Sequence, residues 1–293
     1  MRQILVPLSG QYDPDDPETL DAPALKTAFT LARTFDAHVE VFCMEAETDR
    51  AHRHLSIWVP GATVSEIIDS IEAESERRRE RARAVFDQIA ALLEVPRGLQ
   101  PGAGTGFSTD FIEHTGDVRG ALSFRGRLAD IIVTANAPGR FPGGHPLILE
   151  VALRETGRPV LISPFEPRET VGRRVVVAWN GSTEASRAVA ISMEFLKRAE
   201  SVCVISVREG GPPGPGADDL ANYLRWHGIE AKATTFDGDA ASAGGIVLTE
   251  AESEDADLLV MGAYTRDRVS RLIFGGATRE VLGHGTIPVL MLN

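Results

Sequence analysis

The chain has 293 residues, of which 43% are hydrophobic and 25% charged, and its formal net charge is −12. This length favours two domains over one, and the composition is typical of a soluble globular protein with a hydrophobic core. The acidic balance argues against general nucleic-acid binding, which needs clustered Lys and Arg, and against docking on anionic membranes.

The first ten residues, MRQILVPLSG, contain too short an apolar run for a signal peptide, and no stretch approaches the roughly 20 apolar residues of a membrane span. The two cysteines, Cys43 and Cys203, each lie in an apolar, strand-like run, which favours buried, reduced thiols. These features predict a cytoplasmic protein.

In the first half of the chain, the predicted elements are a strand at 3–10, a strand around Cys43, a long helix over 62–94, and strands at 129–135 and 157–164. The long helix contains the charged stretch ESERRRE (74–80). We interpret this stretch as a solvated face rather than a phosphate or nucleic-acid site, because its charges pair at helical spacing. The expected pairs are Glu74–Arg78, Glu76–Arg79 and Glu80–Arg83.

In the second half, Ser182 is expected to cap a helix, with Glu184 in its first turn. The stretch GPPGPG (211–216) is expected to be a loop. Gly228 is expected to end the helix over 217–227. Strands are predicted at 175–179, 201–207, 229–236, 257–263 and 287–292, and helices at 183–199, 217–227, 242–254 and 275–283.

The two halves resemble each other. QILVPLSG (3–10) matches RVVVAWNG (174–181), ADIIVTA (129–135) matches ADLLVMGA (256–263), and GRPVLISP (157–164) matches GTIPVLMLN (285–293). A repeat of about 170 residues indicates a duplicated domain rather than a solenoid. We predict copy one over 1–166 and copy two over 172–293, each an α/β domain with a Rossmann-like, doubly wound parallel sheet.

Doubly wound sheets bind ligands at the carboxyl ends of their strands, where the strand order reverses. In copy two, this rule brings Trp179, Asn180, Val207 and Gly262 to one edge. The stretch MGAYTRDRVSRLIFGGAT (261–278) reads as a strand end, a basic loop and a glycine pair that opens a helix, an arrangement typical of anion sites. From spacing alone, a second interpretation stays open, in which the glycines allow close helix packing and the arginines are solvated.

Other candidate sites are weaker. His52 and His54 form an H-x-H pair without further evident ligands, and an acidic loop with Asp13, Asp15 and Asp16 lacks the spacing of a calcium loop. The sequence has no G-x-S-x-G elbow and no cysteine in an activating context. We therefore predict no catalytic and no metal-ligating residues.

Four stretches of copy two closely resemble the universal stress protein family: AWNGSTEASRAV (178–189), ADLLVMGAY (256–264), FGGATREVL (274–282) and TIPVLML (286–292). The resemblance covers essentially all of copy two and, more weakly, copy one. It implies a tandem universal stress protein whose copies pack as an intramolecular pseudo-dimer. It also implies a nucleotide-responsive regulatory or binding protein, with ATP or a related adenine nucleotide as its ligand and Mg²⁺ as a possible companion.

In ATP-binding members of that family, the phosphate loop reads G-x2-G-x9-G-(S/T). Gly262 and Gly275 match the outer glycines, whereas Thr265 replaces the middle glycine and Gly276 the Ser/Thr. Thr265 adds a β-branched side chain that disfavours positive φ, so ATP binding should be weakened or reshaped. The binding residues that the resemblance implies are Ala178, Trp179, Asn180 (an aspartate in the family), Val207 (at the adenine), Gly262, Thr265, Arg266, Arg268, Gly275, Gly276, Ala277 and Thr278. Arg266 and Arg268 could compensate as charged phosphate partners.

Copy one departs further from the family. Ala135 replaces the first glycine, and Leu147–Ile148 opens the last helix without a glycine pair, so we expect no ordinary nucleotide site there. The helix at 62–94 could cover that vacated cleft or present a partner surface. Two alternative functions stay open: a non-nucleotide-binding pseudo-dimeric scaffold with an unknown protein partner, and, ranked last, a weak ATP hydrolase. A further homodimer of the tandem chain is also possible.

Overall fold

The computed structural model describes residues 1–10, 21–46, 61–98, 106–136, 147–208, 214–239, 241–263 and 276–293. The strands are β1 (Gln3–Leu8), β2 (His38–Ala46), β3 (Ser108–Gly116), β4 (Ile131–Ala135), β5 (Val160–Ser163), β6 (Arg174–Ala178), β7 (Ser201–Arg208), β8 (Lys232–Asp237), β9 (Leu258–Gly262) and β10 (Val289–Leu292). The helices are α1 (Ala22–Phe35), α3 (Gly61–Leu92), α4 (Val118–Gly126), α5 (Leu147–Glu155), α6 (Thr183–Ile191), α7 (Met193–Leu196), α8 (Ala217–Trp226), α9 (Ala243–Ser253) and α10 (Gly276–His284).

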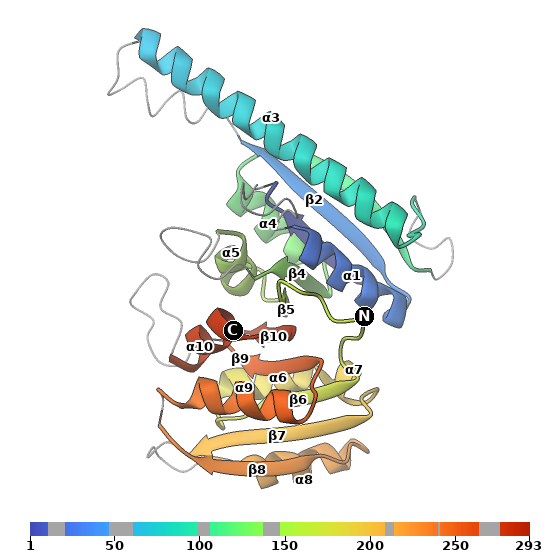
Figure 1. Cartoon of the computed structure of the whole chain (residues 1–293), viewed down its shortest axis with the longest axis vertical. Coiled ribbons are helices and arrows are strands. Elements are labelled where there is room, and N and C mark those ends of the chain that lie inside the picture. Colours follow the sequence, from blue (N-terminus) through green and yellow to red (C-terminus); the bar gives the residue numbers. More distant parts are fainter. Residues whose placement is uncertain are drawn as a thin grey trace.

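All ten of these strands form one sheet, in the order β3-β2-β1-β4-β5-β10-β9-β6-β7-β8 (Figure 1). The order of the second five mirrors that of the first five, and the described strands pair in parallel everywhere except between β5 and β10. There the strands run antiparallel, with Leu161 opposite Leu290. The predicted doubly wound α/β fold, packed as an intramolecular pseudo-dimer, is confirmed. The boundaries 1–166 and 172–293 stay a prediction from sequence.

Side chains of each buried strand alternate between two hydrophobic clusters, one on each face of the sheet. In β9, Leu258 and Val260 belong to the first cluster, and Leu259 and Met261 to the second. Helices α1, α3, α6, α7 and α8 pack on the first face, and α4, α5, α9 and α10 on the second. Burial on both faces explains why these strand sequences are apolar throughout.

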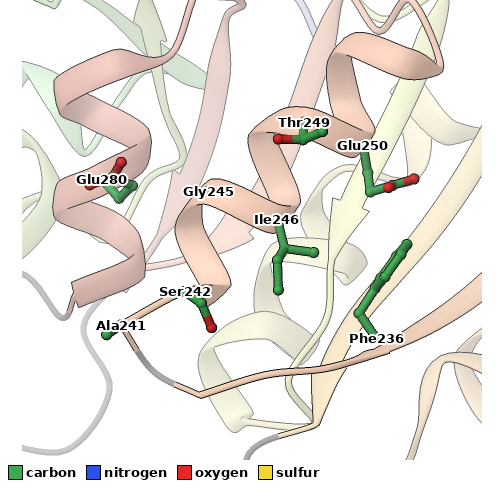
Figure 2. Close-up of a pocket in the computed structure, with 8 residues that line it drawn as sticks. All are labelled: Phe236, Ala241, Ser242, Gly245, Ile246, Thr249, Glu250 and Glu280. Carbon is green, nitrogen blue, oxygen red and sulfur yellow. The ribbon is translucent and has the colours of Figure 1, made fainter.

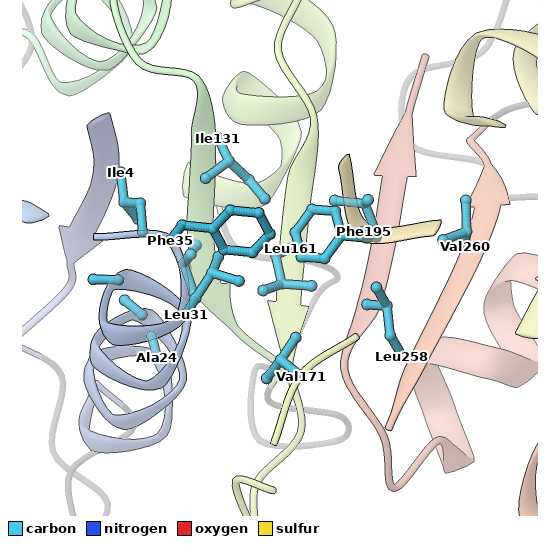
Figure 3. Packing of buried hydrophobic residues seen from close by; sticks show 14 of the residues in the cluster. Ile4, Ala24, Leu31, Phe35, Ile131, Leu161, Val171, Phe195, Leu258 and Val260 are labelled. Carbon is cyan, nitrogen blue, oxygen red and sulfur yellow. The ribbon is translucent and has the colours of Figure 1, made fainter. Parts of the chain in front are cut away.

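The two copies also meet through an aromatic pair on the first face. The ring of Phe35, which ends α1, packs edge-on against Phe195 of α7, with 5.1 Å between ring centroids (Figure 3). The Arg198 guanidinium lies 4.6 Å from the centroid of Phe35 and donates to the carbonyl oxygen of Thr34 at 3.0 Å. The first hydrophobic cluster therefore continues from copy one into copy two.

The repeated Ala-Asp pair that precedes β4 and β9 has a structural role. The Asp257 carboxylate accepts hydrogen bonds from the backbone N–H groups of Gly172, Arg173 and Arg174, at 3.1, 2.8 and 2.8 Å. Asp130 accepts in the same way from the N–H groups that begin β1. Each aspartate thus fixes the start of its neighbouring strand, so this part of the repeat reflects folding rather than ligand binding.

Three local predictions need correction. The helix expected over 183–199 divides at Ser192, whose hydroxyl donates to the carbonyl oxygen of Val189 at 3.0 Å; such back-bonding bends helices. Strand β8 begins at Lys232 rather than at residue 229. The expected Glu80–Arg83 pair does not form, because Arg83 turns toward Asp87 and Glu113.

Helix α3 takes the place of α8 in copy one but has 32 residues against 10, and it extends past the sheet (Figure 1). The predicted Glu74–Arg78 and Glu76–Arg79 pairs form. Hydrogen bonds from Arg78, Arg81 and Arg77 lower the pKa of Glu74 to about 2. These charges also reach beyond the helix, since Arg79 contacts Glu113 of β3 at 2.9 Å.

The two cysteines are confirmed as buried free thiols. Burial, together with the negative charge of Glu254, raises the pKa of Cys203 to about 11. This thiol is therefore protonated at neutral pH and behaves as a small apolar side chain.

Candidate functional site

The end of β6 shapes the carboxyl edge of copy two. Trp179 follows this strand and is 6% exposed. Its indole N–H donates to the carbonyl oxygen of Pro215 at 2.7 Å, and its backbone N–H to that of Ile205 at 2.7 Å. The indole is thus committed to the core and to the segment before α8. Trp179 is one of the predicted site residues and can support this edge of the sheet. Its ring N–H, however, is already bonded to the carbonyl oxygen of Pro215.

The next three residues build the start of α6. The Asn180 side-chain oxygen accepts from the backbone N–H of Ser182 at 3.1 Å, and Gly181 has a φ of +71°. The Ser182 hydroxyl accepts from the backbone N–H of Ala185 at 3.1 Å, which confirms the predicted cap. This turn leaves Asn180 exposed at the point where the strand order reverses, between β6 and β9.

Gly262 ends β9 directly beneath the first turn of α6. A Cβ at this position would lie 2.7 Å from the backbone nitrogen of Ala185 and 2.9 Å from the carbonyl carbon of Glu184. Only glycine permits this close approach of helix and strand. Gly262 therefore has a packing role of its own, in addition to any role at a phosphate.

Ala178 is the last residue of β6 and is half-buried. The other predicted residues divide into those that the structure describes and those that it does not. Gly276, Ala277 and Thr278 form the first turn of α10, in which Gly276 is exposed and Thr278 is buried. Val207 lies near the end of β7, half-buried and paired with Phe236. Four predicted residues lie outside the described part of the chain, so their roles stay predictions: Thr265, Arg266, Arg268 and Gly275.

An open groove of about 530 Å³ lies between β8, α9 and α10 (Figure 2), and sequence reasoning missed it. Phe236 and Ile246 form its apolar part, and Glu250 and Glu280 approach it from two different helices. Its described lining residues include no lysine or arginine. The two carboxylates disfavour a phosphate in this groove.

The corresponding edge of copy one is filled by the chain itself. The Asp21 carboxylate is buried and accepts from the backbone N–H groups of Ser9 at 2.9 Å and Gly10 at 2.7 Å. Helix α3 crosses Gly10 so closely that a Cβ there would lie 2.1 Å from the carbonyl oxygen of Arg78. Arg81 donates to the carbonyl oxygen of Gly10 at 2.9 Å. Of the two roles considered for this helix, the described contacts favour that of a cover over the copy-one cleft.

Comparison with known proteins agrees with this architecture. Residues 172–293 match the profile of the Universal stress protein family. A universal stress protein of Synechocystis sp. is 22% identical over 240 residues, which cover 78% of this chain and 77% of that protein. Residues 172–293 of this chain belong to the universal stress protein family. The resemblance predicted from its sequence is confirmed.

Solved structures extend the likeness in fold to both copies of this chain. One from Archaeoglobus fulgidus DSM 4304, itself a universal stress protein, superposes with a TM-score of 0.66 and 18% identity, over 99% of this chain and 98% of its own. A functionally unknown protein from Pseudomonas aeruginosa PAO1 gives a TM-score of 0.56 and 18% identity, over 99% and 92%. At these identities the structures show a shared fold alone.

Two further observations concern only the described residues. No described helix is long and apolar enough to cross a membrane. No group of three or more His, Cys, Asp and Glu side chains is placed to hold a metal ion within the same residues. The weaker metal candidates His52, His54, Asp13, Asp15 and Asp16 lie outside the described residues.

The buried Asp21 predicts a pH dependence of stability. Desolvation raises the pKa of this carboxyl, against the lowering effect of hydrogen bonds from Ser9 and Gly10. A raised folded pKa means that the group's contribution to stability is fully present below its unfolded pKa of about 3.9 and is lost as the pH rises through the folded pKa. Relative to Asp21→Asn, which does not titrate, the native chain should lose stability as the pH rises from about 4.

Urea denaturation of both proteins at a series of pH values tests this expectation. The difference in unfolding free energy between native chain and variant should shift steadily against the native chain with rising pH. A difference that is flat, or that moves in the opposite direction, would show that the Asp21 carboxylate is better stabilised by its hydrogen bonds than by protonation.

Proposed function

We propose that this universal stress protein is a regulatory or binding protein that holds ATP or a related adenine nucleotide at the carboxyl edge of copy two, and that it has no catalytic reaction of its own. The observation that carries the proposal is the capped start of α6 against Gly262, which leaves Asn180 exposed between β6 and β9. This is the place where doubly wound sheets bind ligands.

The parts of the nucleotide match different groups of this edge. Val207 offers a half-buried apolar contact for adenine, and the first turn of α10 offers backbone N–H groups for phosphate. Arg266 and Arg268 would supply positive charge to the same phosphates, and Mg²⁺ could accompany them.

Calorimetric titration of MgATP into the full chain tests the proposal. We expect binding by the native chain and an affinity at least about tenfold lower for Arg266→Ala, because a hydrogen bond to a charged group contributes roughly 1.5–3 kcal/mol. Thr265→Gly should tighten binding, since it removes a β-branched side chain where backbone approaches phosphate. Arg225→Ala, on the exposed end of α8, is the matched control and should bind like the native chain.

Other outcomes discriminate between the functions. If only Thr265→Gly binds, the site has been lost and the protein is better described as a scaffold. If neither chain binds, the assignment of Gly262 and Gly275 to a phosphate loop is wrong. The scaffold alternative has one specific observation in its favour, the 32-residue α3 that extends past the sheet (Figure 1). ATP hydrolysis ranks last, because no predicted ligand contact is a carboxylate or histidine that could act as a general base.

A further inference from the structure

A buried polar side chain of copy one bonds to the backbone of copy two. The Asn136 amide nitrogen donates to the carbonyl oxygen of Leu282, in α10, at 2.7 Å, and Asn136 is 9% exposed. A carbonyl can only accept a hydrogen bond, so the geometry requires the amide N–H₂ at this position. The backbone N–H of Asn136 donates to the carbonyl oxygen of Ser163 at 2.8 Å, which fixes the residue at the ends of β4 and β5.

Leu282 lies in the last turn of α10, where carbonyl groups have no partner within their own helix. Leu282 as a whole residue is 1% exposed, so its carbonyl is closed to water as well. An unpaired carbonyl in such a place is costly, and the Asn136 amide satisfies it. The contact therefore anchors the end of α10 to copy one.

The start of the same helix is the phosphate end of the proposed site. Gly276 and Leu282 are six residues apart, or about 9 Å along the axis, and a helix of this length moves as a stiff unit. Close packing of Gly244 of α9 against Ala277 and Glu280 limits sliding, since a Cβ at Gly244 would lie 2.9 Å from the Ala277 carbonyl oxygen. A displacement at Leu282 is thus transmitted to the first turn.

Among the described residues, copy two makes no equivalent contact to copy one. In the repeat, Asn136 corresponds to Ala263, whose backbone N–H makes the equivalent bond to the carbonyl oxygen of Leu292 at 2.8 Å. Ala263 has no side-chain donor, so copy two has no equivalent amide with which to anchor α5 of copy one. The backbone frame is duplicated, and the amide is present in the copy that lacks a predicted nucleotide site.

We infer that Asn136 is a positioning residue for the ligand site of copy two: through its amide, copy one sets the position of α10 and thereby the affinity for nucleotide. This inference rests on the proposed function of copy two. It gives copy one a regulatory part in that site, in which changes at the ends of β4 and β5 alter nucleotide affinity without touching the ligand.

The test compares Asn136→Asp with Asn222→Asp in the full chain. The first variant replaces the donor with an oxygen that repels the Leu282 carbonyl, and the second makes the same change on the exposed face of α8. Two quantities are measured: the MgATP affinity by calorimetry, and hydrogen exchange of the peptide 276–284. We expect Asn136→Asp to lower the affinity roughly fivefold or more and to lose protection in α10, with Asn222→Asp unchanged.

Unchanged affinity for Asn136→Asp would overturn the inference, even if α10 exchanges faster, because the amide would then be only a structural anchor. If the native chain binds no MgATP, the proposed function fails separately, and exchange then tests only the positioning step: lost protection supports that Asn136 positions α10, and unchanged protection overturns the inference. If Asn136→Asp destabilises the whole chain, the MgATP affinity of Asn136→Ala is compared with that of the interface variant Phe195→Leu. An equal loss of affinity in a Phe195→Leu chain of matched stability would also overturn the inference.

Discussion

Replacing Phe195 by alanine should lower the free energy of unfolding of the entire chain by about 3–5 kcal/mol, the usual cost of removing a buried aromatic ring. Phe195 is 5% exposed and packs edge-on against Phe35 from the other copy. Its ring also approaches Gly172, where a Cβ would lie 2.7 Å from Cδ1 of Phe195. The cavity left by alanine would thus open between the copies and beside the segment that joins them.

Chemical denaturation measures this effect, with Phe124→Ala as the control. Phe124 lies on α4 and is 69% exposed, so its replacement should change stability by less than about 0.5 kcal/mol. Because the sheet runs unbroken through β5 and β10, we expect the native chain to unfold in one transition. A Phe195→Ala chain that is as stable as the Phe124→Ala chain would contradict the view that this aromatic pair holds the copies together.

The strands and helices were predictable because burial on both faces leaves a clear record in sequence. Runs such as LLVMG of β9 and VLML of β10 are apolar at every position, or nearly so, and the helices between them have polar outer faces. Duplication strengthened each assignment, since a strand found in one copy located its counterpart in the other. The resemblance to a known family then supplied the pairing of the two copies.

Other features had no local signal. The pairing of β5 with β10 joins the last strand of copy one to the last strand of copy two. The sequences VLIS and VLML are both apolar enough to pair with other strands as well, so neither one indicates this partner. Asp21 follows an acidic stretch, and nothing in its neighbours indicates that its carboxylate is buried beneath Ser9 and Gly10. Asn136 resembles any polar residue after a strand, and its partner is 146 positions away.

The candidate site was half predictable for a related reason. Repeat and motif spacing placed Asn180, Gly262 and the start of α10 at one edge, and the described structure agrees for these residues. Sequence spacing does not distinguish a glycine that lets the backbone approach a phosphate from one that lets a helix pack closely. For Gly262 the structure shows a close approach of α6, which favours glycine whether or not a nucleotide binds.

Gly10 allows a test of how tightly α3 covers the carboxyl edge of copy one. Gly10→Ala should lower the free energy of unfolding by about 2–5 kcal/mol, the sum of left-handed backbone strain and overpacking. Gly10 has a φ of +59°, and a Cβ would meet the carbonyl oxygen, carbonyl carbon and Cα of Arg78 at 2.1, 2.6 and 2.8 Å. These are backbone atoms of α3, so no side-chain rotation can relieve the contact.

Gly157→Ala separates the two causes. Gly157 has a similar φ of +66°, but a Cβ there would meet nothing within 4 Å. This control should therefore cost only the strain, about 1–2 kcal/mol. Denaturation gives the difference between the variants, and hydrogen exchange of α3 shows whether the helix has lifted from the edge. Equal costs for Gly10→Ala and Gly157→Ala would mean that α3 yields freely at Gly10, and a cover that yields so easily would leave the copy-one cleft open to a ligand.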